Sequence, residues 1–157
     1  MMEVLFRGQT RKFGEKVNMA GEKLPGNWVY GGAFQGDGDF SIIYGWKNPD
    51  NEVLDVNKHV VYSETLGQYT GAKDKHGNKI FEGDILHGYF EDCCEDCGYT
   101  EFYIYVEYRA DHKHGCGFFL IDPMCPDDIN ILDTATAVEY EVIGNIHDIP
   151  EFLGEKP

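Results

Sequence analysis

Alternation of apolar and polar residues is the strongest local pattern in the chain. Between residues 101 and 108 every second side chain can lie on one apolar face, which comprises Phe102, Ile104, Val106 and Tyr108. Successive side chains of a strand point to opposite faces, so this period of two predicts a half-buried β-strand. No long stretch has the 3.6-residue period of an amphipathic helix. We therefore expect a mainly β protein.

The same reasoning predicts several further strands and a division of the chain. Five strands are expected in the C-terminal part, at about 60–70, 79–88, 101–109, 117–121 and 137–146. In the last of them Val138, Tyr140 and Val142 should face inward, and a turn of helix is expected over 127–132. The N-terminal part predicts strands at 28–30 and 40–44, joined by a glycine-rich turn. We place the boundary near residue 60, between a β-hairpin-rich extension (1–59) and a C-terminal domain (60–157).

Turn chemistry is concentrated between residues 74 and 84. In Asp74-Lys75-His76-Gly77 the aspartate can accept from backbone amides two residues on, and the glycine supplies a left-handed residue. The Gly83-Asp84 pair predicts a sharp bend into the next strand. Asp84 is either a catalytic carboxylate or an acceptor for turn amides, and the turn interpretation is favoured.

Two groups of motifs carry a resemblance to a known family. They are Leu66-Gly-Gln-Tyr-Thr-Gly71, then Asp74-Lys75 with Gly77, then Ile80-Phe-Glu-Gly-Asp-Ile85, and finally Glu141-Val-Ile-Gly-Asn-Ile-His-Asp-Ile-Pro-Glu-Phe-Leu153. This pattern resembles the YopX family of phage and prophage proteins, for which no reaction is established. The resemblance implies an SH3-like small barrel over 60–157. It does not extend to residues 15–60 or 88–135, so the cysteine-rich acidic hairpin at about 88–100 lies outside the shared motifs.

The charge of the chain excludes some functions. Its formal net charge is −15 and its pI is near 4.6, whereas nucleic-acid binding gains most of its affinity from Lys and Arg side chains that neutralise phosphates. Direct nucleic-acid binding is therefore disfavoured. No apolar run is long enough to span a membrane, and the first residues lack the layout of a secretory signal. We expect a cytoplasmic protein of the host cell.

The acidic residues are unevenly distributed. Eight acids and no Lys or Arg lie between Ile80 and Tyr108. This block is either a solubilising hairpin tip or a surface that meets a basic partner or mimics a phosphate backbone. We predict a partner-binding surface at the hairpin, in which charge steers the partner and aromatic side chains anchor it. Its residues are Tyr89, Phe90, Glu91, Asp92, Glu95, Asp96 and Tyr99.

Cysteine and histidine residues raise the alternative of a zinc-stabilised module. The chain has five cysteines, which we expect to be free thiols or ligands in a reducing compartment. Cys94 and Cys97, together with His112, His114 and Cys116, are the residue types of a structural zinc site. However, the strand predicted at 101–109 would separate the two clusters by roughly 26 Å. A shared metal would then need a second subunit, so no metal ligand and no cofactor is assigned.

No catalytic residue is assigned either. The acidic neighbours of Cys93, Cys94 and Cys97 disfavour the thiolate that nucleophilic chemistry requires. Ser41 and Ser63, the only serines, lie in no nucleophile motif. The favoured function is therefore an accessory protein that acts by protein interaction, and an enzyme of unknown type is the remaining alternative. Exposed strand edges and surface aromatics also favour a homo-oligomer.

Overall fold

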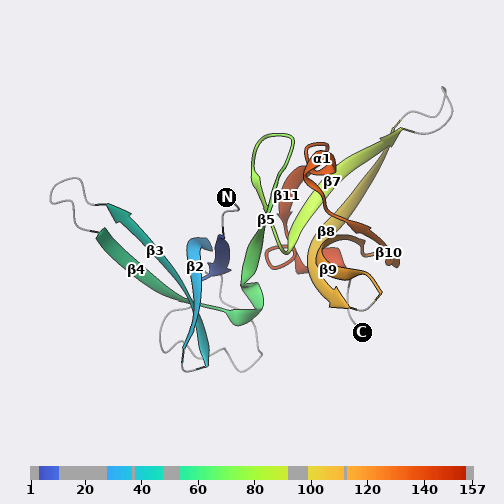
Figure 1. The fold of residues 1–157 in the computed structure, drawn as a ribbon. Coiled ribbons are helices and arrows are strands. Elements are labelled where there is room, and N and C mark those ends of the chain that lie inside the picture. Colours follow the sequence, from blue (N-terminus) through green and yellow to red (C-terminus); the bar gives the residue numbers. More distant parts are fainter. Residues whose placement is uncertain are drawn as a thin grey trace. The chain divides into compact units, whose positions relative to one another are not determined.

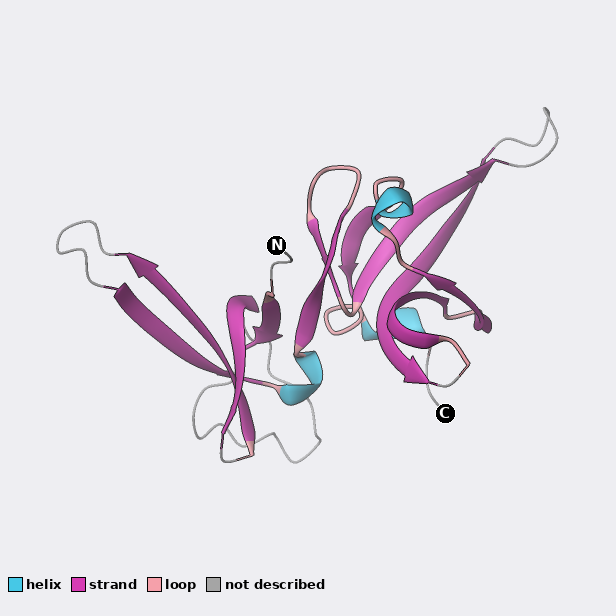
Figure 2. Ribbon diagram, viewed as in Figure 1, coloured by secondary structure: helices cyan, strands magenta, loops and turns pink. Residues whose placement is uncertain are grey.

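The computed structural model describes residues 4–10, 28–36, 38–47, 54–91, 99–111 and 113–154. The described chain is mainly β, as predicted, with one four-residue α-helix and two short 3₁₀-helices (Figures 1 and 2). The strands are β1 (Phe6–Gln9), β2 (Trp28–Gly36), β3 (Asp39–Lys47), β4 (Leu54–Val61), β5 (Gly67–Lys73), β6 (Lys79–Phe81), β7 (Asp84–Glu91), β8 (Tyr99–Asp111), β9 (Gly115–Asp122), β10 (Cys125–Ile131) and β11 (Glu141–Asn145). The helical segments are η1 (Ser63–Thr65), α1 (Thr134–Ala137) and η2 (Pro150–Leu153).

These strands form two antiparallel sheets. The N-terminal sheet has six strands in the order β4-β3-β2-β1-β5-β6, and the C-terminal sheet has five in the order β10-β9-β8-β7-β11. Within the described residues neither sheet closes into a barrel, so the predicted closed SH3-like barrel is replaced by two open sheets. One physical reason is that β11 is short and pairs only with β7 there, so no ladder joins it to β10.

The chain divides into two compact units, Met1–Gln68 and Tyr69–Pro157. In the first unit β2, β3 and β4 form an antiparallel meander, and β1 pairs with β2 on one side and with the start of β5 on the other. The single strand predicted at 60–70 is interrupted by η1. The Thr65 hydroxyl donates to the Tyr62 carbonyl at 2.7 Å and accepts from the Gln9 amide at 2.9 Å, which holds this turn against β1.

In the second unit the C-terminal sheet presents one face to the hydrophobic core. The buried core residues come from both sheets and from α1, and they are Ala72, Ile80, Leu86, Ile104, Val106, Leu120 and Ala137. The strand predicted at 101–109 is confirmed within β8, which pairs with β7 in continuous register from Ile85 opposite Tyr105 to Glu91 opposite Tyr99. Figure 1 shows these two strands side by side along their length.

The strand predicted at 137–146 is confirmed over β11, and Tyr140 and Val142 pack against the core as expected, but its start and one neighbouring prediction were wrong. Residues 134–137, at the edge of the strand predicted at 137–146, form α1, because the Asp133 carboxylate caps it by accepting from the amides of Ala135 and Thr136 at 2.8 Å. Val138 then lies just past the helix with 54% of its surface exposed, rather than facing inward. Most of the segment 127–132, expected as a helical turn, belongs to β10, which pairs with β9.

The predicted turn chemistry is confirmed. The Asp74 carboxylate accepts from the His76 amide at 2.9 Å, and Gly77 has a φ of 83°. Gly83 has a φ of 85°, and the buried Asp84 accepts from the Phe81 amide at 2.7 Å. Asp84 therefore acts as an acceptor within its turn.

Candidate functional site

Those of the predicted partner-binding residues that the structure describes lie near the end of β7 and the start of β8. Asp92, Glu95 and Asp96 lie outside the described residues. Phe90, Glu91 and Tyr99 are placed in the paired ends of β7 and β8, although their side chains are not described. Tyr89 is described fully, and 52% of its surface is exposed. Of the predicted site, the structure therefore describes the surface around Tyr89.

Strand alternation places four neighbouring side chains on the sheet face opposite the core. Leu86 of β7 and Ile104 of β8 point into the core, so His87 and Tyr89 of β7 and Glu101 and Tyr103 of β8 point away from it. The register sets His87 opposite Tyr103 and Tyr89 opposite Glu101. We call these four residues the tyrosine patch.

Ring contacts hold the tyrosine patch together. The His87 ring stacks on Tyr103 with centroids 4.8 Å apart and planes 18° apart, and its edge meets Tyr89 at 4.6 Å. The His87 side chain is only 12% exposed, whereas Tyr103 is 43% exposed. A buried imidazole thus supports two tyrosine rings that solvent can reach.

A carboxylate sets the electrostatics of the tyrosine patch. The Tyr103 hydroxyl donates to Oε2 of Glu101 at 3.1 Å, and this hydrogen bond is the main reason that the pKa of Tyr103 lies above its ordinary value. The His87 Nε2 lies 3.9 Å from the same oxygen. The patch therefore combines aromatic surface with one half-exposed negative charge.

The adjoining strand β11 carries an ion-pair network. Glu141 lies opposite His87 in the register, and its carboxylate contacts the Lys75 Nζ at 2.7 Å and the His76 Nε2 at 3.4 Å. The hydrogen bond from Lys75 holds the pKa of Glu141 below its usual value. The positive charge of Lys75 is thus already paired, so the negative charge of Glu101 is not offset by it.

A shallow hollow continues the tyrosine patch on its other side. It has a volume of about 370 Å³, and Glu101 and Tyr103 form part of its lining together with Met124 and Phe152. Met124 is 87% exposed. Apolar side chains beside the carboxylates of Glu101 and Asp122 suit an incoming side chain that has both an apolar stem and a positive charge.

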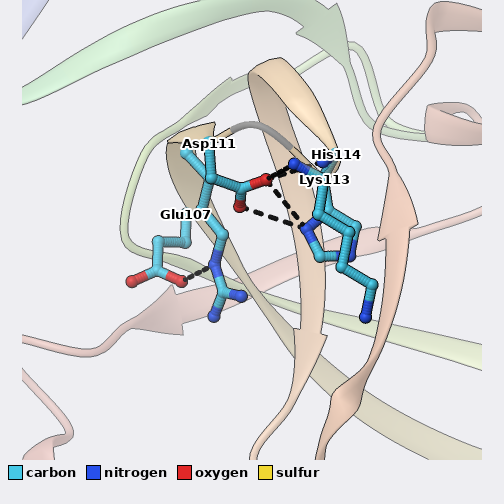
Figure 3. Close-up of polar contacts among 5 residues, drawn as sticks. Glu107, Asp111, Lys113 and His114 are labelled. Atoms are coloured by element: carbon cyan, nitrogen blue, oxygen red, sulfur yellow. Dashed lines mark hydrogen bonds and ion pairs between the residues drawn. The ribbon is translucent and has the colours of Figure 1, made fainter.

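The residues considered for zinc precede and follow β8 in the sequence. Cys94, Cys97 and His112 are outside the described residues. At the β8–β9 turn, the Asp111 carboxylate accepts from the amides of Lys113 and His114 at 2.8 and 2.6 Å and pairs with the His114 ring at 3.1 Å (Figure 3). Cys116 is exposed on β9. No group of three or more His, Cys, Asp or Glu residues in the described ranges is arranged to hold a metal ion.

The histidine of the tyrosine patch was missed by sequence reasoning. The strand at 101–109 was predicted, and Tyr89 was assigned to the partner-binding surface, but His87 was not connected to either. The signal was present, because residues two apart in a strand share a face. Only the β7–β8 register shows that His87 meets Tyr103.

Comparison with known proteins identifies relatives but assigns no site. The chain resembles the crystal structure of protein EF1440 from Enterococcus faecalis with a TM-score of 0.50 and 22% identity, over 98% of this chain and 99% of that one. No curated protein matches the sequence. None of the helices in the described ranges is long and apolar enough to cross a membrane. The family model described as YopX protein matches residues 22–154. The family resemblance seen in the sequence motifs is thereby confirmed, and the chain belongs to the YopX family.

Proposed function

We propose that this YopX protein is a phage- or prophage-encoded accessory protein that acts in the host cytoplasm by binding a basic protein partner. The binding surface is the tyrosine patch together with the acidic hairpin end beyond it. The observation that carries the proposal is that two exposed rings, Tyr89 and Tyr103, both pack against His87.

Three physical features support this function. Tyrosine offers a large contact area together with a polar hydroxyl, and tyrosines are enriched among the residues that dominate binding energy. The patch residues lie on paired strands and their rings already pack against His87, so binding would cost little conformational entropy. The acids between Ile80 and Tyr108, with no Lys or Arg among them, would attract a positively charged partner.

The experiment that tests the proposal compares matched tyrosine variants in affinity capture from host lysate. Partners captured by the native protein are identified, purified and measured for binding to Tyr89→Ala and Tyr103→Ala. We expect each substitution to weaken binding by about tenfold, as for a central aromatic anchor. Tyr108→Ala is the control, since Tyr108 is also in β8 and is 47% exposed but contacts Phe118, outside the patch.

Charge is tested separately. Changing Glu91, Asp92, Glu95 and Asp96 to Asn or Gln should slow association, and raising the salt concentration should do the same to the native protein. A partner whose affinity is unaffected by both the tyrosine and the charge changes would overturn the proposed function. A partner lost equally with Tyr108→Ala would also overturn it, because the loss would not be specific to the patch.

A further inference from the structure

The core face of the C-terminal sheet is not covered along its whole length. Beside the packed core lies a groove of about 440 Å³, a volume within the usual range for binding pockets. Its apolar surface includes Phe102, Ile104 and Leu120, and Tyr140 forms a wall. The Tyr140 ring meets Phe102 edge to face, with centroids 5.9 Å apart. The groove thus has an apolar, partly aromatic lining.

The rim of the groove is negatively charged. Asp122, Asp128 and Asp133 line it, and none of its described lining residues is Lys or Arg. Asp133 is engaged by the amides of α1, and Asp122 accepts from the Met124 amide at 2.8 Å. Asp128 makes only a long contact with the Asn130 side chain, at 3.5 Å. Asp128 is therefore the rim carboxylate best placed to change its partner.

The lining of the groove includes Asp128, which lies where the β9–β10 register is shifted, between Cys125 and Ile129. Asn130 lies opposite Leu120 of β9, so the two share the core face. Asp128, two residues earlier, lines the groove beside Asn130, whereas the neighbouring Asp127 does not line it. Both aspartates are exposed residues of β10. The chain therefore offers two adjacent acids of which only one belongs to the groove.

We propose that this groove binds an arginine side chain presented by an apolar, basic segment of a partner protein. The aliphatic stem of arginine would lie along the apolar lining, as long cationic side chains do on apolar surfaces. Its guanidinium would stack on the aromatic wall and form a bidentate pair with Asp128. A lysine ammonium is more strongly hydrated and lacks the planar fork, so it would bind less well.

This inference does not depend on the tyrosine patch. None of the four residues of the tyrosine patch lines the groove, although the hollow beside the patch shares Phe102 and Asp122 with it. Binding at the groove can therefore be measured alone, with a short peptide and the full-length chain.

The experiment uses a capped pentapeptide of central arginine flanked by leucine, and the same peptide with citrulline, which keeps the shape of arginine but is uncharged. Binding is measured by calorimetry, and the position is checked by the NMR methyl signals of Ile104 and Leu120. We expect the arginine peptide to bind at least about fivefold more tightly than the citrulline peptide, and a lysine peptide to bind in between. The methyl signals should shift only with bound peptide.

Variants of single aspartates test which carboxylate pairs with the arginine of the peptide. Asp128→Asn should weaken binding of the arginine peptide by about fivefold, and Asp122→Asn by less. Asp127→Asn, which removes the same charge one residue away, should leave affinity unchanged. Tyr103→Ala, in the tyrosine patch, should also leave it unchanged. The fold of each variant is confirmed by circular dichroism.

Three results would overturn the proposal. They are the absence of binding by the arginine peptide at millimolar concentration, equal affinity of the citrulline peptide, and an equal loss for Asp127→Asn and Asp128→Asn. The last result would show that binding follows the overall charge of the chain. Failure of the groove would leave the proposed function standing, because the tyrosine patch is tested with its own tyrosine and charge variants, none of which is among the described residues that line the groove.

Discussion

A single buried carboxylate joins two distant parts of the second unit. Asp74, which is 3% exposed, accepts from the amides of His76 and Asn78 in its own turn and from the Val142 amide of β11 at 3.1 Å. Burial raises the pKa of Asp74, but the hydrogen bonds from Val142, Asn78 and His76 outweigh it and hold the pKa below the ordinary value. The turn and β11 are thus tied through one side chain.

Replacing Asp74 should therefore destabilise the protein strongly. We expect Asp74→Ala to lower the free energy of unfolding by about 2–4 kcal/mol, because the backbone amides of His76, Asn78 and Val142 lose their acceptor. Asp74→Asn, which keeps one acceptor oxygen, should cost less. Urea unfolding measures both, with the exposed Asp127→Ala as the control. A loss no larger than that of the control would contradict the bridging role.

The same residue predicts a pH dependence of known sign. A carboxyl group whose folded pKa is depressed stabilises the fold above its unfolded pKa, and this stabilisation is lost as the pH falls through the folded pKa. The stability difference between the native protein and Asp74→Ala should be full at pH 7 and should narrow below about pH 4. Urea unfolding at several pH values measures it. A difference that widens towards acid would show the opposite shift.

At the scale of elements, close packing between β7 and β8 depends on a glycine. A Cβ atom at Gly88 would lie 2.5 Å from the Phe102 ring and 2.9 Å from the Tyr140 ring. Both rings belong to the lining of the acid-rimmed groove. Because Gly88 has no side chain, the rings of Phe102 and Tyr140 can lie close to the backbone of β7.

Gly88→Ala tests this packing. The added methyl group should displace Phe102 or Tyr140 and lower the free energy of unfolding by about 1–3 kcal/mol, as overpacking does. Gly117→Ala in β9 is a suitable control, since its Cβ would meet only the Phe119 ring, at 3.9 Å. Thermal unfolding of the two variants gives the comparison. Equal stability of both would mean that the rings can move aside at no cost.

Local patterns predicted some elements well and others poorly. The alternation at 101–109 and the turn acids Asp74 and Asp84 were identified because their causes lie within a few residues. The helix α1 was not predicted, because Asp133 was not recognised as its N-cap and the apolar residues that follow were assigned to a strand. The strand β10 was missed because Pro126 and two aspartates disfavour strands, whereas pairing with β9 overrides that preference.

The candidate sites show the same limit. Tyr89 could be proposed from the acidic hairpin alone, but its contact with His87 and Tyr103 depends on cross-strand register. The groove could not be found, because its lining comes from β8, β9, β10 and the α1 region, between residues 102 and 140. Such a site is a property of packed strands and not of any sequence motif.

At the scale of the whole molecule, negative charge dominates. The formal net charge of −15 at pH 7 produces self-repulsion in the compact state. Dissolved salt screens this repulsion between exposed groups, because the Debye length falls as the ionic strength rises. Stability should therefore depend on salt even without a partner.

We expect added sodium chloride, from 50 to 500 mM, to raise the midpoint of thermal unfolding at pH 7 by about 2–4 °C. The effect should be much smaller close to pH 4.6, where the net charge is near zero. Differential scanning calorimetry at the two pH values measures it. An equal rise at both would show that the salt acts on apolar surface and not on charge.

The strand β5 has a consequence for how this protein can be dissected. Its first two residues, Gly67 and Gln68, pair with β1, whereas its later residues pair with β6. The division between the two compact units falls between Gln68 and Tyr69, inside this one strand. A fragment that starts at Tyr69 would begin in the middle of a strand, whereas one that starts at Ser63 would retain all of β5. A fragment of the C-terminal part should therefore begin ahead of η1 rather than between Gln68 and Tyr69.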